Sequence, residues 1–372
     1  MRVFFATGEA SGDMLAATLA DAMREFEPDA SFAGIGGERM AAAGFTLTTR
    51  TTGWASLGPL AALRRIPPLL ANMLRHAVWL RARPVDLIVL VDFGAYNLRF
   101  ALTLRALGYR RPILYYVPPG AWLDRESQAR AVARATVPLT PFRHQRDFYA
   151  SLELGAAYFG HPLVSLVPPR GPRPTPPPDG GIVALLPGSR QGEIAHHLPR
   201  LLAACEVLRR TRPRVAFVAG AADADGERCI GEALAKTSLD ICVVRGARAA
   251  LDAADAAWVA SGTAVLEAAL REVPVVALYV IAEAQAPYAR RIWLDRHPFI
   301  TLPNIIMGRA VLPELLQEQA TPAALARALG DALADPARCV RDLQAVRDEL
   351  GDENALRRCA AFAVTVARQQ RV

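Results

Sequence analysis

Two segments in the second half of the chain combine small residues with polar or basic ones in a way that suits phosphate binding. The first, LLPGSRQGEI at residues 185–194, reads as a strand, a Pro-Gly turn, Ser-Arg and then a helix. Its backbone N–H groups and helix N-terminus favour an anion, and Arg190 offers a bidentate fork. We predict that Gly188, Ser189 and Arg190 bind phosphate and that Glu193 belongs to the same nucleotide-sugar site. The alternative is that Ser189 caps the helix and Arg190 is solvated.

The second segment, VASGTAVLEAAL at residues 259–270, has a strand that runs into Ser261-Gly262-Thr263 and then a helix. Glu267 lies one turn further, where its carboxylate can accept hydrogen bonds from ribose hydroxyls. Two anion-binding turns in one half of the chain favour a nucleotide diphosphate over a single phosphate group. Asn304 lies in the apolar segment LPNIIMGRAVLPELLQ and is a candidate for a sugar pocket, with loop solvation as the alternative.

The first half of the chain carries carboxylates where a strand gives way to a helix, in TGEASGDML at residues 7–15. Glu9 and Asp13 can serve there as a base or as acceptors for sugar hydroxyls, while a capping role for Asp13 is the alternative. The histidines carry less information. We expect His161 to be structural, and we place His196 and His197 on the exposed side of a helix without a metal-ligand geometry.

The elements that must position these residues alternate in both halves of the chain. Before a proline-rich stretch, helical segments separate apolar strand candidates at residues 2–7, 32–36, 86–93, 112–117 and 137–140. After it come strand candidates at residues 181–186, 214–219, 240–244, 256–260 and 273–279. Apolar runs of this kind are typical of parallel strands covered on both faces. We predict an α/β protein with two Rossmann-like, doubly wound parallel-sheet domains that face a cleft.

The proline-rich stretch VPPRGPRPTPPPDGG divides the chain, because repeated prolines interrupt both helices and central strands. We predict an N-terminal domain at residues 1–166, a linker at 167–181 and a C-terminal domain at 182–335. Residues 336–372 lack strand signals and are expected to form helices that can cross back to the N-terminal domain.

The net charge of +7 and the pI near 9.5 suit anionic partners such as nucleotide phosphates or acidic lipid surfaces. Scattered arginines without a recognition motif argue against nucleic acid. The five cysteines lack CxxC spacing and indicate reduced thiols in a cytoplasmic protein. Neither a signal peptide nor a membrane span is evident. Residues 63–84 mix Leu, Met and Trp with arginines, as in a helix on a membrane surface or an ordinary amphipathic core helix.

Together, the motifs resemble the lipid-A-disaccharide synthase family of inverting glycosyltransferases, in order and over nearly the whole chain. The matching segments are GEASGD, GIGGERMAAAGF, DxxxxNLR from Asp92, YYV, FGHPL, LLPGSRxxEI, SGTAxLEAAL and LPNII…PELLQ. The resemblance implies a GT-B fold and the transfer of 2,3-diacylglucosamine from UDP-diacylglucosamine to a lipid monosaccharide 1-phosphate. It also implies a peripheral association with the inner face of the inner membrane, and no metal or other cofactor.

Two departures from the family pattern lie in the first half. The family carries a second aspartate near Asp92 where this chain has Ala95, and its Ser-Pro-Ser-Val-Trp-Ala-Trp stretch reads PPGAWLD at residues 118–124. We therefore predict that the base is Asp92, Asp13 or Glu9, or that Asp124 compensates. Two other functions are alternatives: an isomerase like the nucleotide-sugar 2-epimerases, or a degenerate relative that binds UDP-lipid without transferring the sugar.

Overall fold

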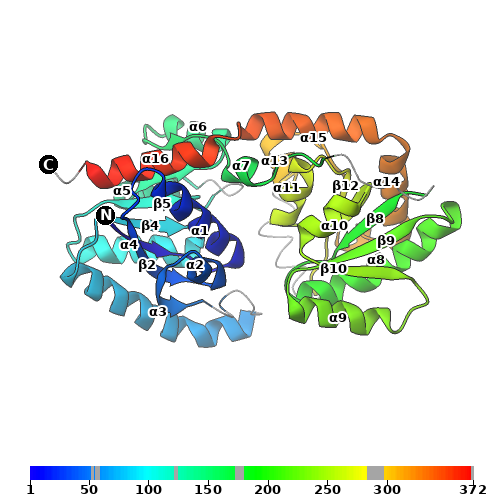
Figure 1. Cartoon of the computed structure of the whole chain (residues 1–372), viewed down its shortest axis with the longest axis horizontal. Helices are drawn as coiled ribbons and strands as arrows, with labels where there is room; N and C mark the ends of the chain where they lie inside the picture. Colours follow the sequence, from blue (N-terminus) through cyan, green and yellow to red (C-terminus); the bar gives the residue numbers. More distant parts are fainter. Residues whose placement is uncertain (52–53, 55–58, 121–124, 172–179, 283–296, 370–372) are drawn as a thin grey trace. The chain divides into compact units, whose positions relative to one another are not determined.

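The computed structural model describes residues 1–51, 54, 59–120, 125–171, 180–282 and 297–369, with only the backbone described at 59–65 and 95. The chain forms two compact units (Figure 1). Unit 1 comprises Met1–Leu166 and Leu350–Val372, and unit 2 comprises Val167–Glu349. The second half of the predicted linker lies largely outside the described residues. The terminal helices divide between the units, because residues 336–349 belong to unit 2 and the remainder to unit 1.

Unit 1 contains a parallel sheet in the order β3-β2-β1-β4-β5-β6-β7. The strands are β1 (Arg2–Ala6), β2 (Ser31–Gly36), β3 (Thr46–Arg50), β4 (Leu87–Val91), β5 (Ile113–Tyr116), β6 (Val137–Thr140) and β7 (Ala157–Tyr158). The helices are α1 (Ala10–Arg24), α2 (Glu38–Ala42), α3 (Pro59–Ala82), α4 (Gly94–Ala106), α5 (Glu126–Ala135), α6 (Arg143–Ser151), α7 (Pro162–Leu166) and α16 (Ala355–Arg368).

Helices cover both faces of this sheet, as its apolar strands require. Because alternate residues of a strand point to opposite faces, Val3 and Phe5 of β1 join one core with α1 and α16. Phe4 and Ala6 join the other core, with α3, α4 and α5. The last helix, α16, packs directly on α1 and α7. The C-terminal segment is therefore part of the hydrophobic core of unit 1.

Unit 2 repeats the architecture with a parallel sheet in the order β10-β9-β8-β11-β12-β13. The strands are β8 (Ile182–Leu186), β9 (Ala216–Ala221), β10 (Ile241–Arg245), β11 (Ala256–Ala260), β12 (Val275–Tyr279) and β13 (Glu314–Leu316). The helices are α8 (Gln191–Thr211), α9 (Ala224–Leu234), α10 (Ala247–Ala253), α11 (Thr263–Leu270), α13 (Leu302–Met307), α14 (Pro322–Ala334) and α15 (Pro336–Leu350).

The ten strands predicted from the sequence are all present, with ends that shift by at most two residues. The prediction missed β3, β7 and β13. The β3 sequence TLTTR is polar because it forms an edge strand that is never fully buried, while β7 has two residues and β13 has three. Short or half-exposed strands lack the apolar run that identifies a central parallel strand.

The order of the strands places one switch point in each sheet. In unit 1 the chain winds from β1 through β2 to β3 on one side, and β4 then starts on the other side of β1. In unit 2, β8, β9 and β10 wind one way and β11 starts on the other side of β8. Ligands of doubly wound sheets bind beyond the strand carboxyl ends at these switch points. A ligand site is therefore expected at the turns after β1, β4, β8 and β11.

Within the described part of the chain, no helix is both long enough and apolar enough to cross a bilayer.

Candidate active site

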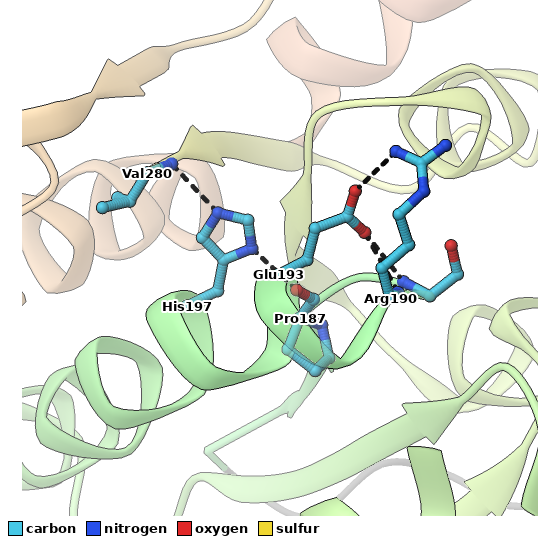
Figure 2. Close-up of polar contacts among 6 residues, drawn as sticks. Pro187, Arg190, Glu193, His197 and Val280 are labelled. Carbon is cyan, nitrogen blue, oxygen red and sulfur yellow. Dashed lines mark hydrogen bonds and ion pairs between the residues drawn. The ribbon is translucent and has the colours of Figure 1, made fainter. Parts of the chain in front are cut away.

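The turn after β8 is organised around a carboxylate (Figure 2). Glu193 of α8 accepts hydrogen bonds from the backbone N–H groups of Ser189 and Arg190 at 3.1 and 3.3 Å, and from Arg190 Nη1 at 3.1 Å. Gly188 has φ +120°, and a Cβ there would lie 2.6 Å from the Glu193 carboxylate, so only glycine fits. The groups that the sequence predicts to bind phosphate, the Ser189 and Arg190 N–H groups and the Arg190 guanidinium, thus bind the Glu193 carboxylate in this structure.

The capping alternative for Ser189 does not hold, because Arg190 is the N-cap residue of α8 and makes no capping bond through its side chain. The Arg190 side chain is 47% exposed and that of Glu193 23%. Since the first N–H groups of a helix have no partner within it, the start of α8 adds further donors at this turn. An incoming anion can therefore reach both the guanidinium and the helix N-terminus.

The turn after β11 lies beside this one, because β11 and β8 pair directly and Val259 is in register with Leu186. Gly262 is the N-cap residue of α11 with φ +151°, and the Ser261 N–H is bonded to the Leu278 carbonyl at 2.9 Å. Glu267 is half-buried on α11, one turn beyond Thr263. Two helix N-termini therefore lie at one switch point, an arrangement that favours anions.

The Asn304 side chain is used inside the protein. It is 1% exposed, donates to the Leu312 carbonyl at 3.0 Å and to Glu314 Oε1 at 2.8 Å, and accepts from the N–H groups of Val311 and Leu312 at 2.7 and 3.1 Å. These four bonds use the full capacity of a side-chain amide. The structure therefore gives this side chain the task of holding the segment between α13 and β13.

His197 corrects a sequence prediction. It was expected on the exposed face of its helix, but it is fully buried. Its Nδ1 lies 2.7 Å from the Pro187 carbonyl and its Nε2 lies 2.9 Å from the Val280 N–H (Figure 2). The helical period contains the missed signal, because His197 falls between Ile194 and Leu201 on the apolar stripe that faces the core. Adjacent His196 is only half-buried.

In unit 1, Asp13 is also used structurally. Its carboxylate is 5% exposed and accepts hydrogen bonds from the N–H groups of Gly37, Arg39 and Met40, at 2.6, 2.8 and 3.3 Å. The capping alternative for Asp13 is therefore wrong as predicted, because Glu9 is the N-cap residue of its own helix α1 and Asp13 instead accepts from the first N–H groups of α2. His161 is buried as well, and its Nδ1 accepts from the Leu163 N–H at 3.1 Å.

Asp92 sits in a constrained turn directly after β4. Asp92 and Phe93 have φ values of +48° and +49°, and such left-handed residues cost on the order of 1–3 kcal/mol each. The turn is held by Asn97, whose Nδ2 donates to the carbonyls of Ala6, Val91 and Asp92 at 2.9–3.1 Å. The Tyr115 hydroxyl donates to the same Asp92 carbonyl at 3.0 Å.

Burial, followed by the charge of Glu9, raises the pKa of Asp92 to about 6. Glu9 is the N-cap residue of α1 and lies three residues after β1, the strand beside β4. The switch point of unit 1 thus brings Glu9 and Asp92 within electrostatic reach of each other. A carboxylate with a pKa near 6 is a better proton acceptor than an ordinary aspartate and is still ionised at pH 7.

Two predicted positions lie wholly or partly outside the described residues. The side chain of Ala95 lies outside the described residues, although its backbone belongs to α4, and so does the whole of Asp124. Within the described ranges, no group of three or more His, Cys, Asp and Glu side chains is arranged to hold a metal ion.

A family model described as lipid-A-disaccharide synthetase matches residues 3–366. The chain is 34% identical to a lipid-A-disaccharide synthase of Synechocystis over 389 residues, which cover 100% of this chain and 99% of that protein. It is 38% identical to the Azotobacter vinelandii lipid-A-disaccharide synthase over 343 residues, which cover 88% of each chain. The relatives thus match over the length of both units.

Solved structures resemble the fold more distantly. The UDP-GlcNAc 2-epimerase of Neisseria meningitidis bound to UDP-GlcNAc has a TM-score of 0.61 at 10% identity, with full coverage of both chains. The calicheamicin glycosyltransferase CalG4 has a TM-score of 0.58 at 16% identity, with 99% of this chain and 98% of that chain covered. These similarities confirm the predicted fold of two Rossmann-like domains of the GT-B type.

The turn that carries Asp92 depends on Asn97, and this dependence can be tested. Replacing Asn97 with Ala removes the two side-chain N–H donors that serve three backbone carbonyls and should lower the free energy of unfolding by about 2–4 kcal/mol. Asn97→Asp should cost more at pH 7, because it places a carboxylate against three carbonyl oxygens. Urea unfolding measures both variants, and an Asn97→Asp protein as stable as the wild type would contradict this account.

Proposed function

The chain belongs to the lipid-A-disaccharide synthetase family, and we propose that it transfers 2,3-diacylglucosamine from UDP to a lipid monosaccharide 1-phosphate, releasing UDP and the lipid A disaccharide. The observation that carries this proposal is the family match over residues 3–366, joined by relatives of that name that match over the whole chain. The isomerase alternative has only a shared fold at 10% identity in its favour. A hexosyltransferase of the GT-B type accounts for the family and the fold together.

We assign the UDP-sugar to unit 2. Two helix N-termini at one switch point, with Arg190 beside them, supply the positive field that a diphosphate needs. During transfer the bond between the anomeric carbon and the diphosphate oxygen breaks, and its electron pair leaves with UDP. The Ser189–Arg190 turn and the Ser261–Thr263 turn would stabilise that growing charge. Glu193 orients Arg190 before the donor binds, and the diphosphate then competes with it for the guanidinium.

We assign the base to Asp92 in unit 1. The attacking acceptor hydroxyl forms the new bond to the anomeric carbon from the face opposite UDP, which inverts the configuration, and its proton passes to a carboxylate. Asp13 already receives three backbone hydrogen bonds, and Ala95 has no group that can take a proton. Asp92 has the raised pKa that suits the task, and Glu9 contributes by its charge.

A transfer assay tests the proposed function. Purified protein is incubated with UDP-2,3-diacylglucosamine and the lipid monosaccharide 1-phosphate, and mass spectrometry detects disaccharide and UDP. We expect both products, and Arg190→Ala should lower kcat/KM on the order of 100-fold because it removes a charged donor to the leaving group. Arg210→Ala, at the exposed far end of the same helix, is the matched control and should be fully active.

Other products would identify the alternatives. UDP without disaccharide would indicate hydrolysis or a different acceptor, an epimerised UDP-sugar would indicate an isomerase, and UDP binding without any product would indicate a degenerate relative.

The pH profile distinguishes the candidate bases. With Asp92 as the base, kcat/KM should fall tenfold per pH unit below about pH 6, because the carboxylate becomes protonated there. Asp92→Asn should abolish transfer at every pH. Glu9→Gln should remain active and move this acidic limb to lower pH, because it removes the like charge that raises the pKa of Asp92. If Glu9→Gln is inactive while Asp92→Asn is active, the two roles are reversed.

We propose further that α3 attaches the protein to the inner membrane surface. Ile66, Leu70, Leu74 and Val78 recur every four residues on one face of this helix and are 39–58% exposed. The other face packs into the core through Met73, Ala77 and Leu80. The core-helix interpretation of this segment therefore applies to one face, and the exposed apolar residues of the other face support the proposed membrane contact. Exposed arginines at positions 75, 81 and 83 complement an anionic lipid surface.

Vesicle sedimentation tests this attachment. The double variant Leu74→Ser/Val78→Ser should bind vesicles that contain phosphatidylglycerol about tenfold more weakly than the wild type, because two partly inserted apolar side chains are lost. Its melting temperature should be unchanged, because the stripe is exposed in the protein. Vesicles of pure phosphatidylcholine are the control for the arginines. Equal binding of the variant and the wild type to the anionic vesicles would contradict the proposal.

A further inference from the structure

His197 is a buried polar residue that the proposed chemistry does not use. It lies beside the Gly188–Arg190 turn, called here the donor turn. It connects three parts of unit 2: the helix α8 that carries it, Pro187 directly before Gly188, and Val280 directly after β12. Figure 2 shows the imidazole between Val280 and Pro187, with Glu193 and Arg190 on the other side of the turn. Two side chains of α8 therefore hold this turn. Glu193 accepts from the N–H groups of Ser189 and Arg190, and His197 bonds to the Pro187 carbonyl that precedes them.

The partners of His197 determine where its proton lies. A carbonyl oxygen can only accept and a backbone N–H can only donate, so Nδ1 carries the proton towards Pro187 and Nε2 offers its lone pair to Val280. Only the neutral ring with this tautomer makes both bonds. Burial lowers the pKa of His197, against the opposing effect of the Pro187 carbonyl and the Glu193 charge, and the His196 charge lowers it further. The ring is accordingly neutral at pH 7.

The end of β12, to which His197 is bonded, also interacts with the donor turn. Tyr279, the last residue of β12, packs against His197 with 6.2 Å between ring centroids. Burial and then the charge of Glu193 raise the pKa of Tyr279, while the charge of Arg190 lowers it. The Tyr279 phenol is thus within electrostatic reach of both charged residues of the turn. The imidazole connects the turn after β8 to the end of β12, two strands away in the sheet, which lies in the same electrostatic field.

Resting on the proposed function, we infer that His197 is a positioning residue for the donor diphosphate. It fastens Pro187, and with it the Gly188–Arg190 turn, to the end of β12, so that the turn's amides and guanidinium are already in place when UDP arrives. Such preorganisation strengthens binding by reducing the ordering that binding requires. His197 touches no reacting atom, so its loss should weaken donor binding and leave the chemical step nearly unchanged at saturating donor.

Three substitutions separate the two bonds of the ring. His197→Phe keeps the ring volume and removes both bonds. His197→Asn places an amide N–H close to the position of Nδ1 and can keep the bond to Pro187. His197→Gln places its amide oxygen close to the position of Nε2 and can keep only the bond to Val280. Because the turn itself is fastened through Pro187, UDP affinity should decrease in the order wild type, Asn, Gln, Phe.

A matched control exists in unit 1. His76 is buried like His197 and also uses both ring nitrogens, with Nδ1 2.8 Å from the Asn72 carbonyl and Nε2 2.9 Å from Thr48 Oγ1. His76→Phe should therefore cost comparable stability without changing the donor turn. It measures what the loss of a doubly bonded buried histidine does to UDP binding through general destabilisation alone.

The experiment is isothermal titration of full-length wild type and the four variants with UDP at pH 8, with melting temperatures and with kcat and KM for the UDP-sugar. We expect His197→Phe to raise the Kd for UDP and the donor KM at least tenfold, with kcat within threefold of the wild type. His197→Asn should recover most of the affinity, and His76→Phe should bind UDP within twofold of the wild type.

The inference is overturned if His197→Phe binds UDP within twofold of the wild type, or if His76→Phe weakens binding as much. Should the Phe variant fail to fold, His197→Asn and His197→Gln decide, and equal or reversed affinities of these two variants also overturn it. If the wild type itself does not bind UDP, the proposed donor site is wrong and the inference falls with it. That result is distinct because no variant is needed to reveal it.

Discussion

The reversal of winding within each parallel sheet is the constraint on which the candidate site depends. In a doubly wound sheet the chain adds strands first on one side of the starting strand and then on the other. The turns after the starting strand and after the first strand on its other side therefore lie next to each other, although neither connects the two strands. In unit 2 these turns are the ones after β8 and β11, which lie 75 residues apart in sequence between Leu186 and Ser261. In unit 1 they carry Glu9 and Asp92.

Satisfaction of buried polar groups determines which residues at these turns remain available to a ligand. Asp13 and Asn304 both have the chemistry of a binding residue, but backbone groups already engage their side chains. An unsatisfied buried donor or acceptor costs more than a typical hydrogen bond contributes, so these bonds are not readily exchanged for a ligand. Arg190 differs because its side chain is 47% exposed and its ion pair is with Glu193, a carboxylate that is itself partly exposed. His197 is buried below the turn and holds it through its bond to the Pro187 carbonyl.

At the Asp92 turn, hydrogen bonds offset an unfavourable backbone conformation. Two consecutive left-handed residues are unfavourable by themselves, and Asn97 and Tyr115 offset that strain with hydrogen bonds to the surrounding carbonyls. The result is a carboxylate held in a buried position beside another negative charge, where its pKa rises to about 6. Strain and a perturbed carboxylate at one switch point are the features expected of a catalytic residue.

The sequence by itself determined the family, the fold class and the ten more apolar strands, because parallel strands buried on both faces must be apolar throughout and the motifs follow one another in a fixed order. It also located the turns around Gly188 and Gly262, since small residues between a strand and a helix have few other uses. The tertiary structure alone decided which polar residues are already engaged. His197 appeared exposed because a histidine pair reads as polar, and Asp13 appeared available because α2, which it caps, lies 25 residues further along the chain. Hydrogen-bond partners far apart in sequence leave no local pattern, and so only the folded chain could reveal them.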